Sequence, residues 1–527
     1  MAQLKHRVPV RLRQNWKLVA LCAAFLAVCW GVFGSGTIRP YVTTARAAEA
    51  GTVTTNLTGA KDLFDASVPH DVRLTFTDEA YEDMLTEYFK DGEKKYVEAD
   101  LVIDGTRIPS VGVRLKGNST LQGLTWKGQS KRRVMPGGGP RQAGDGPPNG
   151  FQPPEGFQPP EGFQPPEGFQ PPEGFDPPGN GQPSGDGQPS GDGQQRGNGR
   201  PPGGGGMMRA SLKAEEPESL PWLISFDEFV EGRRYQGHSQ LAVRPALSGS
   251  SAMLNEALGI AVVGAAGEPT QRSAYGSFTV NGRASTPRLL VEYLDEGYAE
   301  GLGDGVLYKS LASSSFTYKG EDQTAYGTDF KQVDKVGVRD LQPVIDFVKW
   351  VNESSAEEFA AGLAERLDVE SFARYVALQN LMVNFDDMAG PGRNYYLWYD
   401  LAAKKFTVVT WDLNLAFNGD ATSGVHDTIG MGGGRGGMGR MGGHPLKEKF
   451  LADAGFKKLY EEQYRALYAK LLAGDAASGL LDKLVAAYNL NDGADTAKVG
   501  EEAATLRTFL ETRKKTLGAD QAITGTS

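Results

Sequence analysis

Carboxylates and amides gather between residues 384 and 418 of this chain. Five of these side chains stand out, three carboxylates and two amides: Asp386, Asp387, Asn394, Asp412 and Asn414. Carboxylate and amide oxygens bind hard cations such as Mg²⁺, and a further carboxylate can accept a proton from a nucleophile. The stretch is therefore our candidate site for metal-assisted catalysis. A polar turn beside a structural hairpin is the alternative that needs no chemistry.

A β-hairpin is predicted within this stretch. Residues 394–399 are rich in aromatic side chains and residues 405–411 alternate in polarity, which is typical of two strands. Folding the hairpin about Ala402 places the side chains of Asn394 and Asp412 roughly 5–8 Å apart, as for cross-strand neighbours. An amide and a carboxylate at that separation can share one hard cation.

Length and charge narrow the class of protein. The 527 residues suffice for two domains or one two-lobed domain. Lys and Arg number 55 against 65 Asp and Glu, a net charge of -10, which argues against a general nucleic-acid binder. The two cysteines, Cys22 and Cys29, both lie in an apolar N-terminal segment. The remainder of the chain therefore forms no disulfide and no thiolate metal site.

The N-terminal segment predicts a membrane helix. Basic residues precede an uncharged run from Leu18 to Ile38, which is long enough to span a bilayer at about 1.5 Å per residue. We assign residues 1–45 to a signal anchor and tether, with the body outside the cytoplasm. A cleaved signal peptide, cut after residues 45–47, is the alternative and would give a secreted protein.

Two low-complexity segments interrupt the rest of the chain. Residues 136–206 contain FQPPEG repeats and are predicted to be disordered, because proline at this density blocks helices and sheet ladders. Residues 430–443 form a Gly/Met-rich loop. The repeats could bind a partner through their regularly spaced Phe residues, or they could be a tolerated insertion. The Gly/Met-rich loop could close over a substrate, or it too could be a tolerated insertion.

Hydrophobic patterning predicts an α+β protein. Residues 68–310 read mostly as strands, with one main helix at 251–263 and a last strand at 305–309. Residues 311–520 turn helical. Asp78 and Asp368 are the expected N-caps of two helices. The β-rich part would form a small lobe and the helical part a larger one.

Several motifs resemble the CotH kinase family, whose members are spore-coat-type kinases of the secretory pathway. The matching segments are RLKGNST at 114–120, ISFDEF at 224–229, VEYLDEGY at 291–298, GVLYKS at 305–310, and VNFDD, RNYYLWYD and FTVVTWDLNLAF between 383 and 417. The resemblance extends from Asp71 to about Leu471, apart from the two inserts. It implies an atypical two-lobed protein-kinase-like fold over residues 60–527, with a β-rich N-lobe and a mainly helical C-lobe.

The resemblance also implies an activity. The family transfers a phosphoryl group from ATP, with Mg²⁺ or Mn²⁺, to a Ser or Thr hydroxyl of a protein substrate. By analogy with kinases, Asp386 would accept the hydroxyl proton, with Asp387 as a rival, and Asn394 and Asp412 would hold the metal. The chain has no HRD triplet, and Asp386 precedes Asn394 by eight residues rather than the five of ordinary kinases.

The resemblance further implies that cationic side chains neutralise the charge of the ATP phosphates, and three are candidates. Arg114 and Lys116, or Lys309, would contact ATP, and Glu292 would orient one of them through an ion pair. No Gly-rich nucleotide loop precedes Arg114, so the sequence leaves open which cation meets ATP.

Two other functions stay open beside the kinase. The space outside a cell is poor in ATP, so the chain could be a catalytically silent kinase-fold module for surface or coat assembly, or for adhesion. A metal-dependent hydrolase built on Asp386 and Asp412 is the third possibility, although histidine, the commonest ligand of such sites, occurs only five times in the chain.

Overall fold

The computed structural model describes residues 53–117, 120–130, 212–247, 250, 252–430 and 443–525. The expected N-terminal membrane helix and the insert at 136–206 lie outside the described residues. Of the loop at 430–443, only the two end residues are described. Within the described ranges, no helix is long and apolar enough to cross a bilayer.

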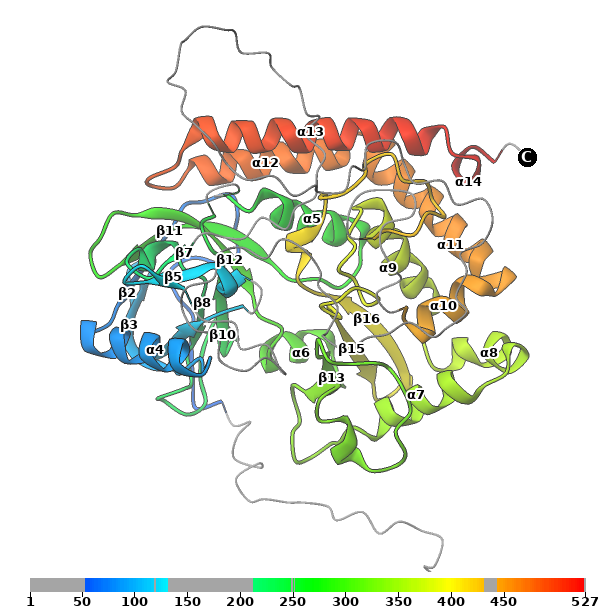
Figure 1. Ribbon diagram of the computed structural model, residues 1–527, viewed down its shortest axis with the longest axis horizontal. Coiled ribbons are helices and arrows are strands. Elements are labelled where there is room, and N and C mark those ends of the chain that lie inside the picture. Colours follow the sequence, from blue (N-terminus) through cyan, green and yellow to red (C-terminus); the bar gives the residue numbers. More distant parts are fainter. Residues whose placement is uncertain are drawn as a thin grey trace, which may run out of the picture. The chain divides into compact units, whose positions relative to one another are not determined.

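A closed β-barrel forms the N-lobe (Figure 1). Its strands in the described residues are β2 (His70–Thr75), β3 (Val97–Ile103), β4 (Thr106–Leu115), β8 (Trp222–Ser225), β10 (Gln240–Val243), β11 (Ser273–Val280) and β12 (Thr286–Glu292), in the order β10-β12-β11-β2-β3-β4-β8. Alternate side chains such as Leu74, Leu101 and Ile224 fill the barrel interior. Short strands pair outside it: β1 (Thr55–Leu57) with β9 (Arg233–Tyr235), and β5 (Leu124–Trp126) with β6 (Gln129–Ser130) and β7 (Leu212–Lys213).

Three helices accompany the N-lobe sequence: α4 (Asp78–Lys90), α5 (Leu254–Ala266) and α6 (Glu296–Leu302). The expected cap of α4 was wrong by one residue. Thr77, not Asp78, is the N-cap, and its hydroxyl accepts a hydrogen bond from the Ala80 amide at 3.2 Å. Asp78 instead lies in the first turn, where its charge suits the helix dipole.

A second sheet lies in the C-lobe, in the order β14-β13-β15-β16. Its strands are β13 (Gly305–Ser310), β14 (Phe330–Gln332), β15 (Tyr395–Asp400) and β16 (Lys405–Thr410). Strand β13, which we expected to close the N-lobe, pairs with β15 instead. Its Val306 and Tyr308 side chains are buried in the same apolar cluster as helix α9, so the change of lobe falls before β13.

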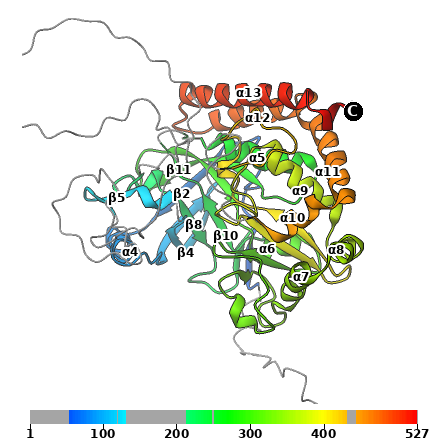
Figure 2. The same cartoon turned by 45° about the vertical axis from the view of Figure 1, so that its right-hand side comes forward.

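Helices make up the rest of the C-lobe (Figure 2). They are α7 (Gln342–Glu353), α8 (Ala356–Gly362), α9 (Val369–Leu381), α10 (Pro445–Ala452), α11 (Ala454–Leu467), α12 (Ala476–Asn489), α13 (Thr496–Gly518) and α14 (Gln521–Thr524). The expected N-cap of α9 is confirmed, because the Asp368 carboxylate accepts a hydrogen bond from the Ser371 amide at 3.0 Å.

Helix α5 connects the two lobes. It packs against η5, a short 3-10 helix at Leu413–Leu415, and against α12. A methyl group on Gly259 would lie 3.1 Å from the Leu413 side chain, so only glycine allows this close approach without adjustment. Directly after α5, the Glu268 carboxylate accepts hydrogen bonds from Ser371 and Arg374 of α9. The position of α5 is therefore fixed by both lobes.

Candidate functional site

The predicted hairpin is confirmed, with its strands paired from Tyr395↔Thr410 to Asp400↔Lys405. By this register Asn394 lies opposite Trp411, one residue beyond the last pair. Asp412 follows with a left-handed φ of 56°. A non-glycine residue adopts this conformation at a cost in free energy. At Asp412 this backbone conformation ends the alternation of side chains along the strand and changes the direction of the carboxylate.

The Asp412 carboxylate belongs to a buried ion cluster. The Arg244 guanidinium lies 2.9 Å from Asp412 Oδ1 and also contacts the Glu256 carboxylate. Arg244 follows strand β10 and Glu256 lies in the first turn of α5, where its side chain is fully buried. Burial by itself would raise the pKa of Asp412, but the charges of Arg244, Lys116 and Lys309 hold that pKa below its ordinary value. Asp412 is thus kept ionised.

Two lysines approach the same carboxylate from different elements. Lys116 follows β4 and Lys309 lies on β13, and their ammonium groups stand 5.4 Å and 5.0 Å from the centroid of the Trp411 ring. Burial, together with the positive charge of Arg244, lowers the pKa of Lys116 to about 7. The arrangement has three cations around one ionised acid, which is an environment suited to a polyanion bound with a metal ion.

The lowered pKa of Lys116 predicts a pH-dependent affinity for a phosphate-bearing ligand. The cationic form is lost as pH rises above about 7, and a bound phosphate favours that form. We expect the affinity for Mg·ATP to fall by up to about tenfold per pH unit between about pH 7 and 9, with uptake of a proton on binding. Calorimetry in buffers of different ionisation enthalpy measures both the affinity and the number of protons taken up on binding. Lys116→Met should flatten the profile, and an affinity independent of pH in the unaltered protein would contradict this role.

Asp386 lies in the loop before the hairpin and is held by hydrogen bonds. Its Oδ1 accepts from the Gly392 amide at 2.6 Å, and its Oδ2 accepts from Asn394 Nδ2 at 3.0 Å. Burial raises the pKa of Asp386, and the nearby charges of Asp412 and Asp387 add to that rise. The charge of Asp412 is thus near enough to affect Asp386.

Asp387 has a different environment. Its carboxylate forms an ion pair with Lys447 of α10 and accepts a hydrogen bond from the Ala389 amide at 2.8 Å. The side chain is buried, with 4% of its surface exposed. Asp387 therefore ties the loop to α10, whereas Asp386 contacts only groups of its own loop and strand end in the hydrogen bonds of the described residues.

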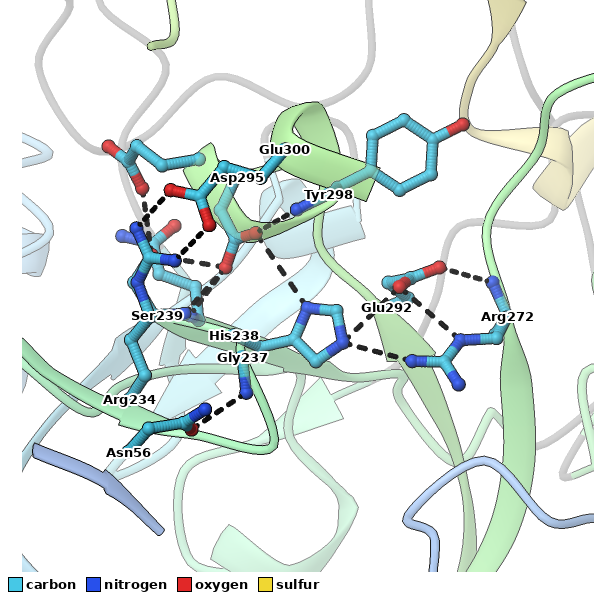
Figure 3. A network of polar contacts seen from close by, with 12 residues as sticks. Asn56, Arg234, Gly237, His238, Ser239, Arg272, Glu292, Asp295, Tyr298 and Glu300 are labelled. Carbon is cyan, nitrogen blue, oxygen red and sulfur yellow. Dashed lines mark hydrogen bonds and ion pairs between the residues drawn. The ribbon is translucent and has the colours of Figure 1, made fainter. Parts of the chain in front are cut away.

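Two of the expected phosphate-site residues do not join the cluster. Glu292 ends β12 and pairs with His238 at 3.3 Å and Arg272 at 3.4 Å, as Figure 3 shows. The expected ion pair between Glu292 and Arg114, Lys116 or Lys309 is therefore wrong. The Arg114 guanidinium lies over the Tyr96 ring, 5.0 Å from its centroid. Lys116, two residues further on, would share the face of Arg114 in a regular strand. It lies just beyond the end of β4, however, and its ammonium group joins the cluster.

Arg244 and Glu256 were missed by the sequence analysis. Arg244 directly follows the strand QLAV, and Glu256 is the one charged residue of helix α5. A lone carboxylate in an apolar helix needs a buried partner, and that was the signal available. In the structure it is Glu256, and not Glu292, that contacts a cation of the cluster.

The fold and the site together define a class. The Arg244–Glu256 ion pair joins the end of barrel strand β10 to helix α5, which follows it. The loop with Asp386 precedes the hairpin of β15 and β16, and Asp412 follows that hairpin. Protein kinases have the same order: a strand lysine, a helix glutamate, a catalytic-loop aspartate and a metal-binding aspartate. Arg244 stands where those kinases carry lysine. The class is a two-lobed protein-kinase-like protein.

Comparison with known families agrees with this class. The family model described as CotH kinase protein matches residues 195–517. The match spans more than half of the chain, and the chain belongs to the CotH kinase protein family. The resemblance noted in the motifs is thereby confirmed, and membership assigns the protein to the kinases. No curated protein is significantly similar in sequence.

Two of the matching solved structures are distant from this chain. The crystal structure of the Helicobacter pylori proinflammatory kinase CtkA aligns with a TM-score of 0.27 and 10% identity, over 54% of this chain and 90% of that one. A chain of the Shewanella oneidensis MR-1 toxin–antitoxin complex of HipA, HipB and operator DNA aligns with a TM-score of 0.26 and 10% identity, over 55% of this chain and 60% of that one. TM-scores this low do not establish a common fold, so the assignment rests on the family match.

Proposed function

We propose that this protein transfers the γ-phosphoryl group of ATP, bound with Mg²⁺ or Mn²⁺, to Ser or Thr hydroxyls of a protein substrate. The observation that carries the proposal is the meeting of Arg244, Lys116 and Lys309 around the ionised Asp412. Phosphoryl transfer demands little covalent work from an enzyme and depends on positioning and neutralised phosphate charge. Cations from three separate elements around one metal-binding acid meet that demand.

The donor set fits a hard cation. In the described residues, only Oδ1 of Asp412 is hydrogen-bonded, which leaves Oδ2 for a metal ion. Asn394 donates through its amide nitrogen to Asp386, which leaves its Oδ1 as a second ligand. Asp412 and Asn394 would hold the ion, and the ion would neutralise charge on the β- and γ-phosphates.

The remaining steps fall to groups of the chain itself. Asp386 would accept the proton of the acceptor hydroxyl, because its pKa is raised and its two oxygens are fixed by Gly392 and Asn394. Lys116 and Lys309 would neutralise phosphate oxygens, and Arg244, held by Glu256, would keep Asp412 oriented. Ordering these groups before substrate arrives reduces the entropy cost of reaching the transition state.

Phosphoryl transfer in the full chain tests the proposal. With γ-labelled ATP and Mg²⁺ or Mn²⁺, label should enter Ser or Thr of a protein substrate or of the chain itself. Chelation of the metal should abolish the transfer, and restored metal should recover it. Transfer that persists without a divalent ion, or label confined to inorganic phosphate, would count against the proposal.

A second candidate function is a kinase-fold module that binds nucleotide without turnover. Arg244 already pairs with one oxygen of Asp412, and this contact competes with a metal ion. Nucleotide binding without transfer in the same assay would favour this alternative. The basic and then uncharged N-terminal segment supports a location outside the cytoplasm for either function, whether anchored or secreted.

A further inference from the structure

The ring of Trp411 is contacted by residues from both lobes. Trp411 directly follows strand β16, and 6% of its surface is exposed. Its ring packs edge to face against Tyr293, which follows barrel strand β12, with 5.4 Å between the ring centroids. The corresponding distance to Tyr396 of β15 is 5.3 Å. The indole is therefore fixed by the barrel on one side and by the second sheet on the other.

Aromatic rings also surround the two lysines of the ion cluster. The Lys309 ammonium group lies over three rings, at 5.0 Å from the centroid of Trp411, 5.5 Å from Tyr396 and 5.7 Å from Tyr293. The Lys116 ammonium group lies over Trp411 at 5.4 Å. A cation within about 6 Å of a ring centroid is attracted to the negative face of the ring, most strongly for tryptophan. Trp411 is thus the ring that both ammonium groups share.

The hydrogen-bond donors of these two ammonium groups remain available. Among the described residues, neither the Lys116 nor the Lys309 ammonium group forms a hydrogen bond or an ion pair at contact distance. Lys447, in contrast, is bound directly to Asp387. An ammonium group carries three N–H donors, and an aromatic face attracts its charge without supplying an oxygen acceptor. Phosphate oxygens can therefore take up these donors without breaking an existing hydrogen bond.

The positive charges of Arg244, Lys116 and Lys309 repel one another, because each of them lies near Asp412. A lysine side chain is flexible, and such repulsion would otherwise turn its ammonium group toward solvent. The attraction to a rigid, buried indole offsets part of the repulsion and limits the directions open to each ammonium group.

We propose that Trp411 is a positioning residue for phosphate binding, whose indole holds the ammonium groups of Lys116 and Lys309 in place to receive phosphate oxygens. This inference rests on the proposed binding of ATP at the cluster, and it adds a residue that touches the lysines rather than the nucleotide.

NMR of the full chain with ¹³C-labelled lysine tests the geometry in the absence of nucleotide. Protons held over an indole face are shifted upfield by the ring current. We expect upfield ε-methylene signals for Lys116 and Lys309, assigned through Lys116→Met and Lys309→Met. Both signals should return to ordinary positions in Trp411→Leu. Trp411→Phe, which keeps a smaller ring in the same place, should give smaller changes of the same sign and serves if the leucine variant does not fold.

Calorimetry with Mg·ATP and with inorganic tripolyphosphate, which carries phosphates without a nucleoside, tests the consequence for binding. Trp411→Leu should weaken both affinities by about tenfold, and Trp411→Phe should weaken them less. In a chain that already carries Lys116→Met and Lys309→Met, Trp411→Leu should cause little further loss, because the ring acts only through those lysines.

Trp398→Leu is the matched control. Trp398 lies on β15, is also 6% exposed and belongs to the same apolar cluster as Trp411. No cation of the described residues lies over its ring. Its substitution removes the same side chain from the same cluster and should lower the melting temperature about as much as Trp411→Leu. It should leave both affinities within about twofold of the unaltered protein.

Upfield lysine signals that depend on Trp411, together with a loss of affinity that disappears in the lysine variants, support the proposal. Lysine signals unchanged by Trp411→Leu overturn it, as does a loss of affinity that is equal with and without the lysines or is matched by Trp398→Leu. In those cases the unaltered chain still binds Mg·ATP, so the proposed function stands. A chain that binds neither Mg·ATP nor tripolyphosphate would overturn the proposed function and the role of Trp411 together.

Discussion

Asp386→Asn is expected to lower the rate of phosphoryl transfer by about 10²–10⁴-fold, the usual contribution of a general base. Asp387→Asn, one residue away, should keep the rate within about tenfold, because that carboxylate already pairs with Lys447. The two variants remove the same group from neighbouring positions of one loop. The ratio of their kcat values therefore measures the assignment of the base directly.

The free energy of unfolding should respond to the two substitutions in the opposite order to the rate, with the larger loss in Asp387→Asn. The raised pKa of Asp386 means that the folded protein disfavours its ionised form. This group favours folding below its unfolded pKa of about 4, and that contribution is lost as pH rises through the folded pKa. At neutral pH, Asp386→Asn should therefore leave stability unchanged or increase it. Asp387→Asn should decrease it, because Lys447 is left without its partner.

Thermal unfolding beside steady-state kinetics checks both halves of this prediction. The dependence of kcat on pH is a third test, since the rate should rise with pH as Asp386 ionises. A large loss of rate in Asp387→Asn with little loss in Asp386→Asn would exchange the two roles.

Arg244→Met is expected to be the most destabilising single substitution at the site, by about 3–5 kcal/mol. The guanidinium compensates both Glu256, which is fully buried, and Asp412. Without it, the fully buried Glu256 carboxylate and the partly exposed Asp412 carboxylate lose the cation that they share. Burial already raises the pKa of Glu256, so this acid should take up a proton in the variant and make stability fall as pH rises.

Partial rescue tests the cause of that loss. The double variant Arg244→Met with Glu256→Gln removes one of the two uncompensated charges and should recover part of the stability, because the two changes are coupled. Arg244→Lys should retain most of it by keeping the charge. Asp482→Asn is the control: it removes the partner of Arg507 in an exposed ion pair and should change stability little. Chemical denaturation measures these four variants and Glu256→Gln alone, and strictly additive effects of Arg244→Met and Glu256→Gln would contradict a shared cluster.

Local signals determined much of the architecture. The hairpin at 395–410 follows from an aromatic-rich run and an alternating run on the two sides of a turn. Asp368 caps α9 because its side chain reaches an amide three residues ahead. Such features depend on neighbours in sequence and can be predicted from them. The error at Thr77 is of the same kind, since two adjacent residues could each cap α4 and only the backbone geometry chose between them.

The sequence alone singled out the hairpin, Asp386 in the loop before it and Asp412 directly after it, because acids that flank a hairpin are visible as a pattern. Only the tertiary structure decided which cations and which glutamate accompany them. Strand β13 pairs with β15 rather than with the barrel, and α5 turns Glu256 toward Arg244. These choices depend on contacts between residues far apart in the chain, where burial and charge pairing, rather than local periodicity, set the free energy.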